Sequence, residues 1–200
     1  MRYASHIVVV DDGSTDGTAD AARSKAAVVV SHPVNLGQGA ALQTGLDFAL
    51  RRGADYICTF DADGQHDPAT IALMLQRLTD SGAEVALGSR FLGGTIDMPV
   101  LRRFMLNVAI AFTRLQTRMP LTDTHNGLRM FTRRAASQIR INHSGMAHGS
   151  EILSSIVKLK LSVIEVPTIV RYTDYSKRKG QSISNSVHIM IDLMYAALCR

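Results

Sequence analysis

The sequence predicts an α/β protein in which a mostly parallel sheet has helices on both faces. Three observations lead to this fold class: short β-branched runs, polar turn residues after each run, and segments of helical composition between them. The runs lie at residues 7–10, 28–30 and 55–60. Continuous apolar runs of this length are typical of strands buried on both faces, and strands that alternate with helices favour parallel pairing.

Helices are expected between these strands and after them. Residues 15–25 have a helix-compatible composition, and residues 39–52 carry apolar side chains near helical spacing: Ala40, Ala41, Leu42, Leu46, Ala49 and Leu50. A third helix at residues 68–80 and a strand at 84–87 continue the alternation. The chain has 200 residues, which suffices for one α/β domain with a buried core.

The pattern changes after residue 94. It predicts a basic amphipathic helix at 100–118, a loop at 120–126, a short strand at 128–131, a helix at 148–160 and paired strands at 163–166 and 168–172. A terminal amphipathic helix is expected at residues 184–199. Because no repeat, low-complexity tract or linker interrupts the chain, residues 1–200 are expected to form a single domain.

The composition restricts the classes of partner. The 22 basic residues against 17 acidic ones give a net charge of +5, most of it in the C-terminal half. This balance suits phosphorylated substrates, an anionic membrane surface or nucleic acid. The sequence has no Trp, only 6% aromatic residues and no RNA-binding aromatic strand pair, so we expect no nucleic acid partner.

The cysteines and the apolar runs indicate a cytoplasmic protein. Cys58 and Cys199 have the spacing of neither a disulfide framework nor a metal site, which fits a reducing compartment. The first residues do not form a signal peptide pattern. The apolar stretch at residues 187–199 is too short to cross a bilayer.

Polar loops directly after strands are the first candidates for a site, because ligands of open parallel sheets bind beyond the carboxyl ends of the strands. Residues 11–18 form one such loop. Its Ser, Thr and Asp residues favour a helix cap, but a cap does not need the two successive carboxylates Asp11 and Asp12. Asp12 is the better candidate to accept hydrogen bonds from a nucleotide. In a second loop, residues 35–40, free backbone N–H groups at a helix start favour an anion.

The third loop contains Asp61, Asp63 and Gln65 immediately after a predicted buried strand. In an extended segment these alternate side chains point to one side and can converge on one point. Two carboxylates and an amide oxygen suit Mg2+ or Mn2+, which commonly keep positions for phosphate oxygens. His66 is ambiguous as a ligand, and Asp67-Pro68 is expected to start the following helix.

Several motifs together resemble family 2 glycosyltransferases, and most closely the branch of dolichol-phosphate mannose synthases and polyprenyl-phosphate glycosyltransferases. Their order and spacing match over essentially the whole chain: Val10-Asp11-Asp12-Gly13-Ser14-Thr15-Asp16-Gly17-Thr18, Asn35-Leu36-Gly37-Gln38-Gly39, Asp61-Ala62-Asp63-Gly64-Gln65-His66 and Gly88-Ser89-Arg90. Asp123-Thr124-His125-Asn126-Gly127-Leu128-Arg129 resembles that branch's Asp-Thr-x-x-Gly-Phe-Arg segment, with Leu128 in place of Phe. Glu165-Val166-Pro167 and Gly180-Gln181-Ser182 resemble its late strand and basic loop.

The resemblance implies a GT-A fold and a set of ligand contacts. Val10 and Asp12 would contact the nucleoside, while the segment Asp61, Ala62, Asp63 and Gln65 would bind the metal and the diphosphate. The family also implies phosphate contacts from Arg90, from either Arg102 or Arg103, and from Lys177 in a loop that would close over the donor.

One departure concerns the start of the chain. Family members begin with a strand, a Pro-x-Tyr-Asn-Glu-like loop and a helix, whereas this sequence starts at what resembles their second strand. The difference is roughly 30 residues, the size of one such strand-helix unit. We therefore expect a chain that is N-terminally truncated relative to the family, or a nucleoside site that is completed differently.

The function expected from the resemblance is metal-dependent, inverting transfer of a sugar from GDP-mannose or a UDP-sugar to a polyprenyl or dolichyl phosphate. An acceptor phosphate is already anionic and needs no strong general base, whereas a saccharide hydroxyl does. Glu151 and Asp123 are the candidate bases, although they equally fit a helix first turn and a loop cap. The alternatives are a transferase with a saccharide acceptor in surface-polysaccharide assembly, a nucleotidyltransferase, whose glycine-rich basic N-terminal loop is missing, and an inactive truncated binding subunit.

A position at the inner face of the plasma membrane follows from the same interpretation. The head of a lipid-phosphate acceptor lies at the interface, where Arg102, Arg103 and residues 177–179 could attract it together with anionic lipids. The apolar face of the terminal helix could rest at the headgroup boundary. We expect peripheral, reversible binding.

Overall fold

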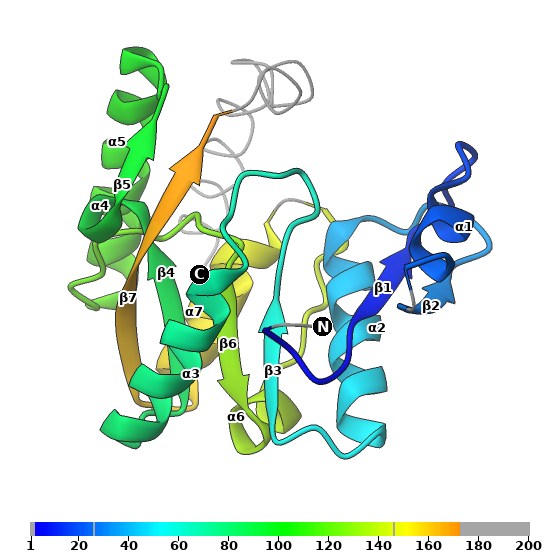
Figure 1. Ribbon diagram of the computed structural model, residues 1–200. Coiled ribbons are helices and arrows are strands. Elements are labelled where there is room, and N and C mark those ends of the chain that lie inside the picture. The colour runs from blue at the N-terminus through cyan, green and yellow to red at the C-terminus, as the bar shows by residue number, and fades with distance from the viewer. Residues whose placement is uncertain (1–2, 26, 146, 173–200) are drawn as a thin grey trace.

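The computed structural model describes residues 3–25, 27–145 and 147–172 and has two sheets (Figure 1). The predicted terminal helix, Lys177 and the motif at residues 180–182 lie outside the described residues. The smaller sheet pairs β1 (Val8–Asp11) with β2 (Val28–Ser31) in parallel. The larger has five strands in the order β3-β6-β4-β7-β5: β3 (Tyr56–Thr59), β6 (Arg129–Thr132), β4 (Val85–Ser89), β7 (Val163–Arg171) and β5 (Gly94–Ile96).

Helices cover both faces of the larger sheet, as the sequence predicts. One face packs against α2 (Gln38–Arg51), α6 (Arg133–Gln138) and α7 (His148–Lys158), with Leu46, Phe131 and Ile152 in its core. The other face packs against α3 (Ala69–Ser81) through Met74 and Leu78. Three further helices complete the described chain: α1 (Thr18–Arg23), α4 (Arg90–Gly93) and α5 (Val100–Thr117).

The sheet is mixed, because β6 runs antiparallel to both of its neighbours, β3 and β4. The other neighbours, β4 with β7 and β7 with β5, are parallel. The segment between α5 and β6 returns the chain to the carboxyl ends of β3 and β4, so that β6 starts where those strands end. This arrangement places the loop at residues 118–128 beside the loops that follow β3 and β4.

Burial differs from the prediction for the first three strands. The three valines of β1 are only partly buried, Val28 of β2 is 42% exposed and Tyr56 of β3 is 43% exposed, so none of the three strands is buried on both faces. The strand that is buried along its whole length is β4, where Val85 and Leu87 face one core and Ala86 faces the other. β4 has a helix layer on each face, whereas β1 and β2 pair only with each other among the described strands.

The two strands predicted around Pro167 form one continuous strand, β7. Pro167 lacks an N–H group, but it lies where β7 changes its partner: Ser89 of β4 aligns with Pro167, and Gly94 of β5 aligns with Ile169. A strand tolerates proline where no ladder hydrogen bond is needed. The short elements α4, β5 and α6 were not predicted.

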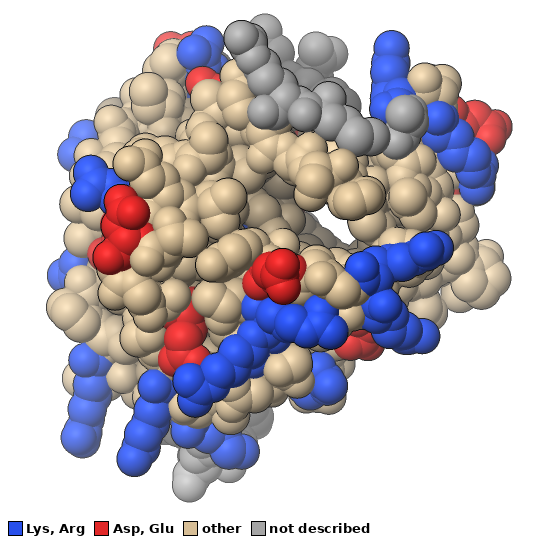
Figure 2. Space-filling view, turned by 60° about the horizontal axis from the view of Figure 1, so that its bottom comes forward, with Lys and Arg blue, Asp and Glu red and all other residues tan. Residues whose placement is uncertain are grey.

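Basic side chains spread over the end of the molecule opposite to the strand-end loops. Exposed Arg133 and Arg134 lie there, since Arg133 Nη1 donates to Ala54 O at 3.2 Å and Arg134 pairs with Glu84 at 3.3 Å, where β3 and β4 begin. Figure 2, in which this end comes forward, shows Lys and Arg across the face. Part of the positive charge of the C-terminal half, which the sequence suggested for phosphorylated substrates or an anionic surface, is therefore far from the predicted site.

Candidate active site

The loop after β3 carries the predicted metal ligands and is fixed to β7. Arg171 N donates to Gln65 O at 2.9 Å, and His66 forms an isolated bridge with Val170. The segment is a turn with a positive φ of 76° at Gly64, not the extended stretch that we predicted. Asp61, Asp63 and Gln65 are nevertheless partly buried while Ala62 and Gly64 are exposed, so the alternation of the side chains persists.

His66 packs inside this turn. It is 8% exposed and lies edge-on to the ring of Phe60, with 6.0 Å between the ring centroids. Burial lowers the pKa of His66, although the nearby carboxylate of Asp61 acts in the opposite direction. A neutral imidazole is therefore part of the packing beneath the turn.

Asp61 and Asp63 each retain an oxygen for a ligand. Asp61 Oδ1 accepts from Gln38 Nε2 at 3.2 Å, and Asp63 Oδ1 accepts from Gln65 N at 3.0 Å. No described residue donates to the second oxygen of either carboxylate. The donor set of hard oxygens suits Mg2+ or Mn2+. Across the described ranges, no three His, Cys, Asp or Glu side chains gather as a metal site.

Gly127 allows the next loop to approach Asp61. A Cβ atom at Gly127 would lie 2.0 Å from Asp61 Oδ2, so that no other residue fits there without displacing the carboxylate. Thr59 Oγ1 fixes the same loop by donating to Gly127 O at 2.8 Å. The Asp123–Arg129 motif thus needs glycine at position 127 because the backbone there packs against the Asp61 carboxylate.

Asp12 joins the first two predicted loops. Its Oδ1 contacts His32 Nδ1 at 2.7 Å and accepts from Leu36 N at 2.9 Å, while its Oδ2 accepts from Gly37 N at 2.7 Å. Burial raises the pKa of Asp12, but these hydrogen bonds outweigh that effect and hold the pKa below its usual value of 3.8. The N–H groups of the glycine-rich turn, where we expected an anion, therefore bind the carboxylate of Asp12. Val10, the other predicted nucleoside contact, packs beside Gly45 of α2.

Glu151 fixes the loop before α7 and is not available as a general base. Its carboxylate accepts from Asn142 N at 3.0 Å, from Asn142 Nδ2 at 2.9 Å and from His143 N at 2.9 Å. The backbone of this loop contacts the glycine-rich turn, since a Cβ atom at Gly39 would lie 1.9 Å from His143 O. Glu151 therefore supports the turn from which Gln38 reaches Asp61.

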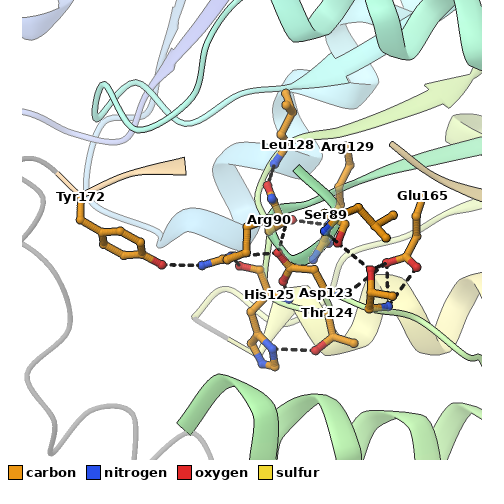
Figure 3. A network of polar contacts seen from close by, with 12 residues as sticks. Ser89, Arg90, Asp123, Thr124, His125, Leu128, Arg129, Glu165 and Tyr172 are labelled. Carbon is orange, nitrogen blue, oxygen red and sulfur yellow. Dashed lines mark hydrogen bonds and ion pairs between the residues drawn. The ribbon is translucent and has the colours of Figure 1, made fainter. Parts of the chain in front are cut away.

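Arg90 and Asp123 form a buried ion pair at the centre of a polar network (Figure 3). Arg90 Nε donates to Asp123 Oδ2 at 2.6 Å, Nη1 donates to Tyr172 Oη at 2.9 Å and Nη2 donates to His125 O at 2.8 Å. The side chains of Arg90 and Asp123 are 7% and 0% exposed. Each guanidinium nitrogen is thus engaged within the protein, with one N–H left on each Nη atom. The buried Asp123 carboxylate is occupied by Arg90 and is no candidate base.

Glu165, the first residue of the Glu-Val-Pro motif, fixes the loop before β6. From β7 it accepts hydrogen bonds from Thr122 N at 2.8 Å, from Thr122 Oγ1 at 2.9 Å and from Asp123 N at 3.1 Å. Ser89 Oγ contacts Thr122 Oγ1 at 2.6 Å from the end of β4. The network therefore joins the ends of β4 and β7 to the loop before β6.

Arg129 is a buried cation that sequence reasoning did not select. It is 5% exposed, and burial lowers its pKa to about 10, although Asp61 and Asp123 act in the opposite direction. Its Nε donates to Asn126 O at 3.1 Å, and its Nη2 lies 3.4 Å from the position of a Cβ atom on Gly149. The adjacent His125 has a pKa of about 4 because of burial, so its imidazole is neutral. The signal was available in the sequence, since Arg129 closes the Asp123–Arg129 motif.

The structure distinguishes the two arginines that the resemblance left open. Arg102 is partly buried, with its guanidinium carbon 5.1 Å from the centroid of the Tyr172 ring. Tyr172 in turn accepts from Arg90, so Arg102 lies next to the network. Arg103 is exposed and no contact joins it to these residues. Arg102 is the arginine that the fold brings to the site.

Comparisons with known proteins agree with this arrangement. The family model described as glycosyl transferase family 2 matches residues 2–140. The UDP-N-acetylglucosamine–dolichyl-phosphate N-acetylglucosaminyltransferase of Methanococcus voltae is 32% identical over 94% of this chain and 84% of its own length. The polyprenol monophosphomannose synthase of Mycolicibacterium smegmatis is 32% identical over 91% and 73%. Among solved structures, glucosyl-3-phosphoglycerate synthase from Mycobacterium tuberculosis, in complex with Mn2+ and UDP-glucose, superposes with a TM-score of 0.73 at 19% identity over 98% of this chain and 68% of that one.

Proposed function

Because this chain belongs to glycosyl transferase family 2 and has the GT-A fold, we propose that it transfers a sugar from a nucleoside diphosphate sugar to a polyprenyl phosphate. The chain is a glycosyltransferase. The donor class we propose is GDP-mannose or a UDP-sugar, and residues 1–200 form a single catalytic domain in this proposal. The two named relatives support the acceptor class, since their names specify dolichyl phosphate and polyprenol monophosphate.

On the donor side, the loop after β3 supplies the metal ligands. The free oxygens of Asp61 and Asp63, with the amide oxygen of Gln65, would hold Mg2+ or Mn2+. A divalent cation bound there stabilises the negative charge that develops on the departing diphosphate. Gln38 and Gly127 keep the Asp61 carboxylate in place, and Arg129 adds a positive charge beneath it.

The observation that carries the proposal is the state of the two candidate bases. Asp123 is fully buried against Arg90, and Glu151 accepts hydrogen bonds from backbone and side-chain donors on both oxygens. A saccharide hydroxyl would need a base to take its proton, whereas the oxygen of a phosphate monoester is already anionic. That oxygen attacks the anomeric carbon as the bond to the diphosphate breaks, and the direct displacement inverts the anomeric centre.

For the acceptor phosphate we propose Arg102 together with the remaining N–H groups of Arg90. Arg102 lies over Tyr172, and its guanidinium makes no hydrogen bond with another described residue. Arg90 has two further N–H hydrogens, one on each Nη atom, that none of these three side-chain hydrogen bonds uses. A phosphate oxygen that reaches them would be bound by two arginines with fixed geometry.

The proposed position is peripheral at the inner face of the plasma membrane. None of the helices in the described part of the chain combines the length and apolar character needed to cross a bilayer. A polyprenyl phosphate keeps its charged head at the interface, so an enzyme that uses it works at that surface. Lys177 and the terminal helix, predicted as further contacts, belong to the segment that the structure does not describe.

The test is a transfer assay with radiolabelled nucleotide sugars, with Mg2+ or Mn2+ or with excess chelator. Polyprenyl phosphate and free saccharides are offered as acceptors in parallel. We expect a product only with polyprenyl phosphate and only with metal. Transfer to saccharide hydroxyls alone would favour the polysaccharide-assembly alternative, and donor binding without any transfer would identify a binding subunit.

A further inference from the structure

Helix α5 is apolar on the side that faces away from the protein. Its inner side buries Ile110, Thr113 and Thr117. On its outer side lie large apolar residues with high exposed fractions: Val100 at 85%, Leu101 at 53%, Phe104 at 65%, Val108 at 39% and Leu115 at 80%. Figure 1 shows α5 at the edge of the molecule beside β5. An isolated exposed apolar side chain needs no explanation, but a set on one helix does.

These five residues form one continuous stripe. At about 100° per residue, their Cα directions fall within a sector roughly 100° wide. Ile110, Thr113 and Thr117 point in nearly the opposite direction. A contiguous exposed apolar face of this kind typically marks a docking surface. We call Val100, Leu101, Phe104, Val108 and Leu115 the α5 stripe.

The charged residues of α5 and of its two flanking positions are all positive. Residues 99–118 contain four arginines and no Asp or Glu. Arg103 and Arg114 are exposed and follow one border of the stripe, and exposed Arg118 ends the helix. An apolar face bordered by arginines is the pattern of helices that lie in the plane of a membrane interface.

We infer that the α5 stripe docks the protein on an anionic lipid bilayer. A second copy of the chain is a poorer occupant, because a two-fold contact between two α5 stripes would bring the arginines of both copies together. The exposed basic face at the opposite end of the sheet does not compete, since no helix of the described chain there has a set of exposed large apolar side chains beside Arg51, Arg52, Arg133 and Arg134. Phe104 and Leu115 would enter the boundary between headgroups and acyl chains, and Arg103 and Arg118 would contact anionic headgroups.

Docking through α5 deepens the proposed function, because it specifies which face meets the bilayer that holds a polyprenyl phosphate. α5 begins beside the site, since Arg102 contacts Tyr172. Arg102 lies on the protein side of α5, so a bilayer along the stripe would be about one helix diameter away from the arginines proposed for the acceptor phosphate. The docking itself requires neither the donor sugar nor the metal.

The experiment measures flotation of the full chain with vesicles of phosphatidylcholine, with and without phosphatidylglycerol, at low and high salt. We compare the wild type with the double variant Phe104→Ser/Leu115→Ser. The matched control is Leu73→Ser/Leu75→Ser on α3, whose leucines are 36% and 38% exposed. Arg103→Gln is compared with Arg77→Gln, an exposed arginine of α3.

We expect the wild type and both α3 controls to float with anionic vesicles at low salt. The stripe variant should bind at least about tenfold more weakly, given roughly 0.8 kcal/mol per buried CH2 group, and Arg103→Gln should lose affinity for anionic vesicles only. Equal flotation of the stripe variant and the wild type would overturn the inference. So would a wild type that does not float, or a dimer that Phe104→Ser dissociates.

A second measurement separates docking from catalysis. Transfer to a water-soluble short-chain polyprenyl phosphate, without vesicles, should be the same for the stripe variant and the wild type. If that transfer is absent in the wild type while flotation depends on the stripe, docking stands and the proposed function fails. If soluble transfer falls in the stripe variant as much as flotation does, the stripe is part of the folded site and the docking inference fails.

Discussion

Arg90 Nε lies 2.6 Å from Asp123 Oδ2, and the two residues are buried together although 33 positions separate them in the chain. Asp123 also accepts from Arg90 N at 3.1 Å, so the carboxylate holds both the side chain and the backbone at the end of β4. Glu165 fixes the same loop from β7. The ion pair thus sets the position of the loop that reaches Asp61 through Gly127.

Asp123→Asn should lower stability strongly, because it leaves the Arg90 charge buried without its partner. Removing one member of a buried pair costs about 3–5 kcal/mol, which corresponds to a melting temperature lower by roughly 6–20 °C in a chain of this size. Thermal unfolding followed by circular dichroism measures it. The control is Asp20→Asn, since the Arg23–Asp20 pair is 54% and 87% exposed and should contribute at most about 1 kcal/mol. Equal melting temperatures for the two variants would contradict a structural role of the pair.

Asp63→Asn should remove most transfer activity and leave the fold intact. An amide keeps the oxygen that accepts from Gln65 N, so the turn persists, but the negative charge for the metal is lost. Because a bound cation supplies several kcal/mol of charge stabilisation, we expect kcat/KM to fall roughly a hundredfold or more. Asp67→Asn is the control, since Asp67 only accepts from Ala69 N at the start of α3. Activity of Asp63→Asn in excess chelator would rule out the metal assignment.

The positions of the loops could be predicted from the sequence, whereas the partners of their side chains could not. A run of β-branched residues followed by Asp61 and Asp63 locates a strand end, because strand periodicity and turn residues are local signals. Asp12 and the N–H groups of Leu36 and Gly37 were both selected, but only the fold shows that they bind each other across 24 and 25 positions. The motif that contains Arg90 predicted a phosphate ligand. The hydrogen bond from Arg90 to Tyr172, 82 positions away, could be seen only in the fold.

Strand direction and burial were also beyond the sequence. The run at residues 128–131 predicted a strand but not its direction, which the path of the chain after α5 determines. β1 and β4 have similar apolar character, yet β4 is buried along its whole length and β1 only in part. Both properties depend on neighbours that are distant along the chain.

Glu151→Gln distinguishes a loop anchor from a catalytic base. Glutamine keeps one acceptor oxygen and turns an NH2 group toward the N–H groups of Asn142 and His143, so we expect lower stability and a modest loss of activity. A general base would account for about 10²–10⁴-fold in rate. The measurement is kcat against pH for both proteins. A loss of that size together with a vanished acidic limb, at unchanged melting temperature, would instead identify Glu151 as the base.

The stability contributed by Asp12 should depend on pH in acid. Burial raises the pKa of Asp12. Hydrogen bonds from His32, Leu36 and Gly37 outweigh this effect and hold the folded-state pKa below the usual value of 3.8. A carboxyl with a depressed folded pKa stabilises the fold above its unfolded pKa, and the stabilisation is lost as the pH falls through the folded pKa. Urea unfolding should therefore show a constant difference between wild type and Asp12→Asn near neutral pH, which shrinks below pH 3.8. A difference that stays constant into that range would contradict the ionised contact.

Arg129→Met should lower activity more than stability, because Arg129 holds a charge that the fold does not need. Burial lowers its pKa to about 10 and yet leaves it protonated at neutral pH, and its hydrogen bond in the described chain is the one from Nε to Asn126 O. Arg129 forms no ion pair with a described carboxylate, so its replacement leaves no hydrogen-bonded charged partner behind and removes the desolvation cost of a buried cation. Without the guanidinium, however, the carboxylates of Asp61 and Asp123 and the donor diphosphate lose a nearby positive charge. Donor affinity and kcat should therefore both fall, by roughly tenfold or more. Calorimetric titration with the nucleotide sugar measures donor affinity, and a melting curve measures stability. The control is Arg140→Met, because the Arg140 side chain is 58% exposed.

A different outcome would assign Arg129 to packing and not to the phosphates: Arg129→Met unfolds the protein, while a folded Arg129→Lys binds the donor like the wild type.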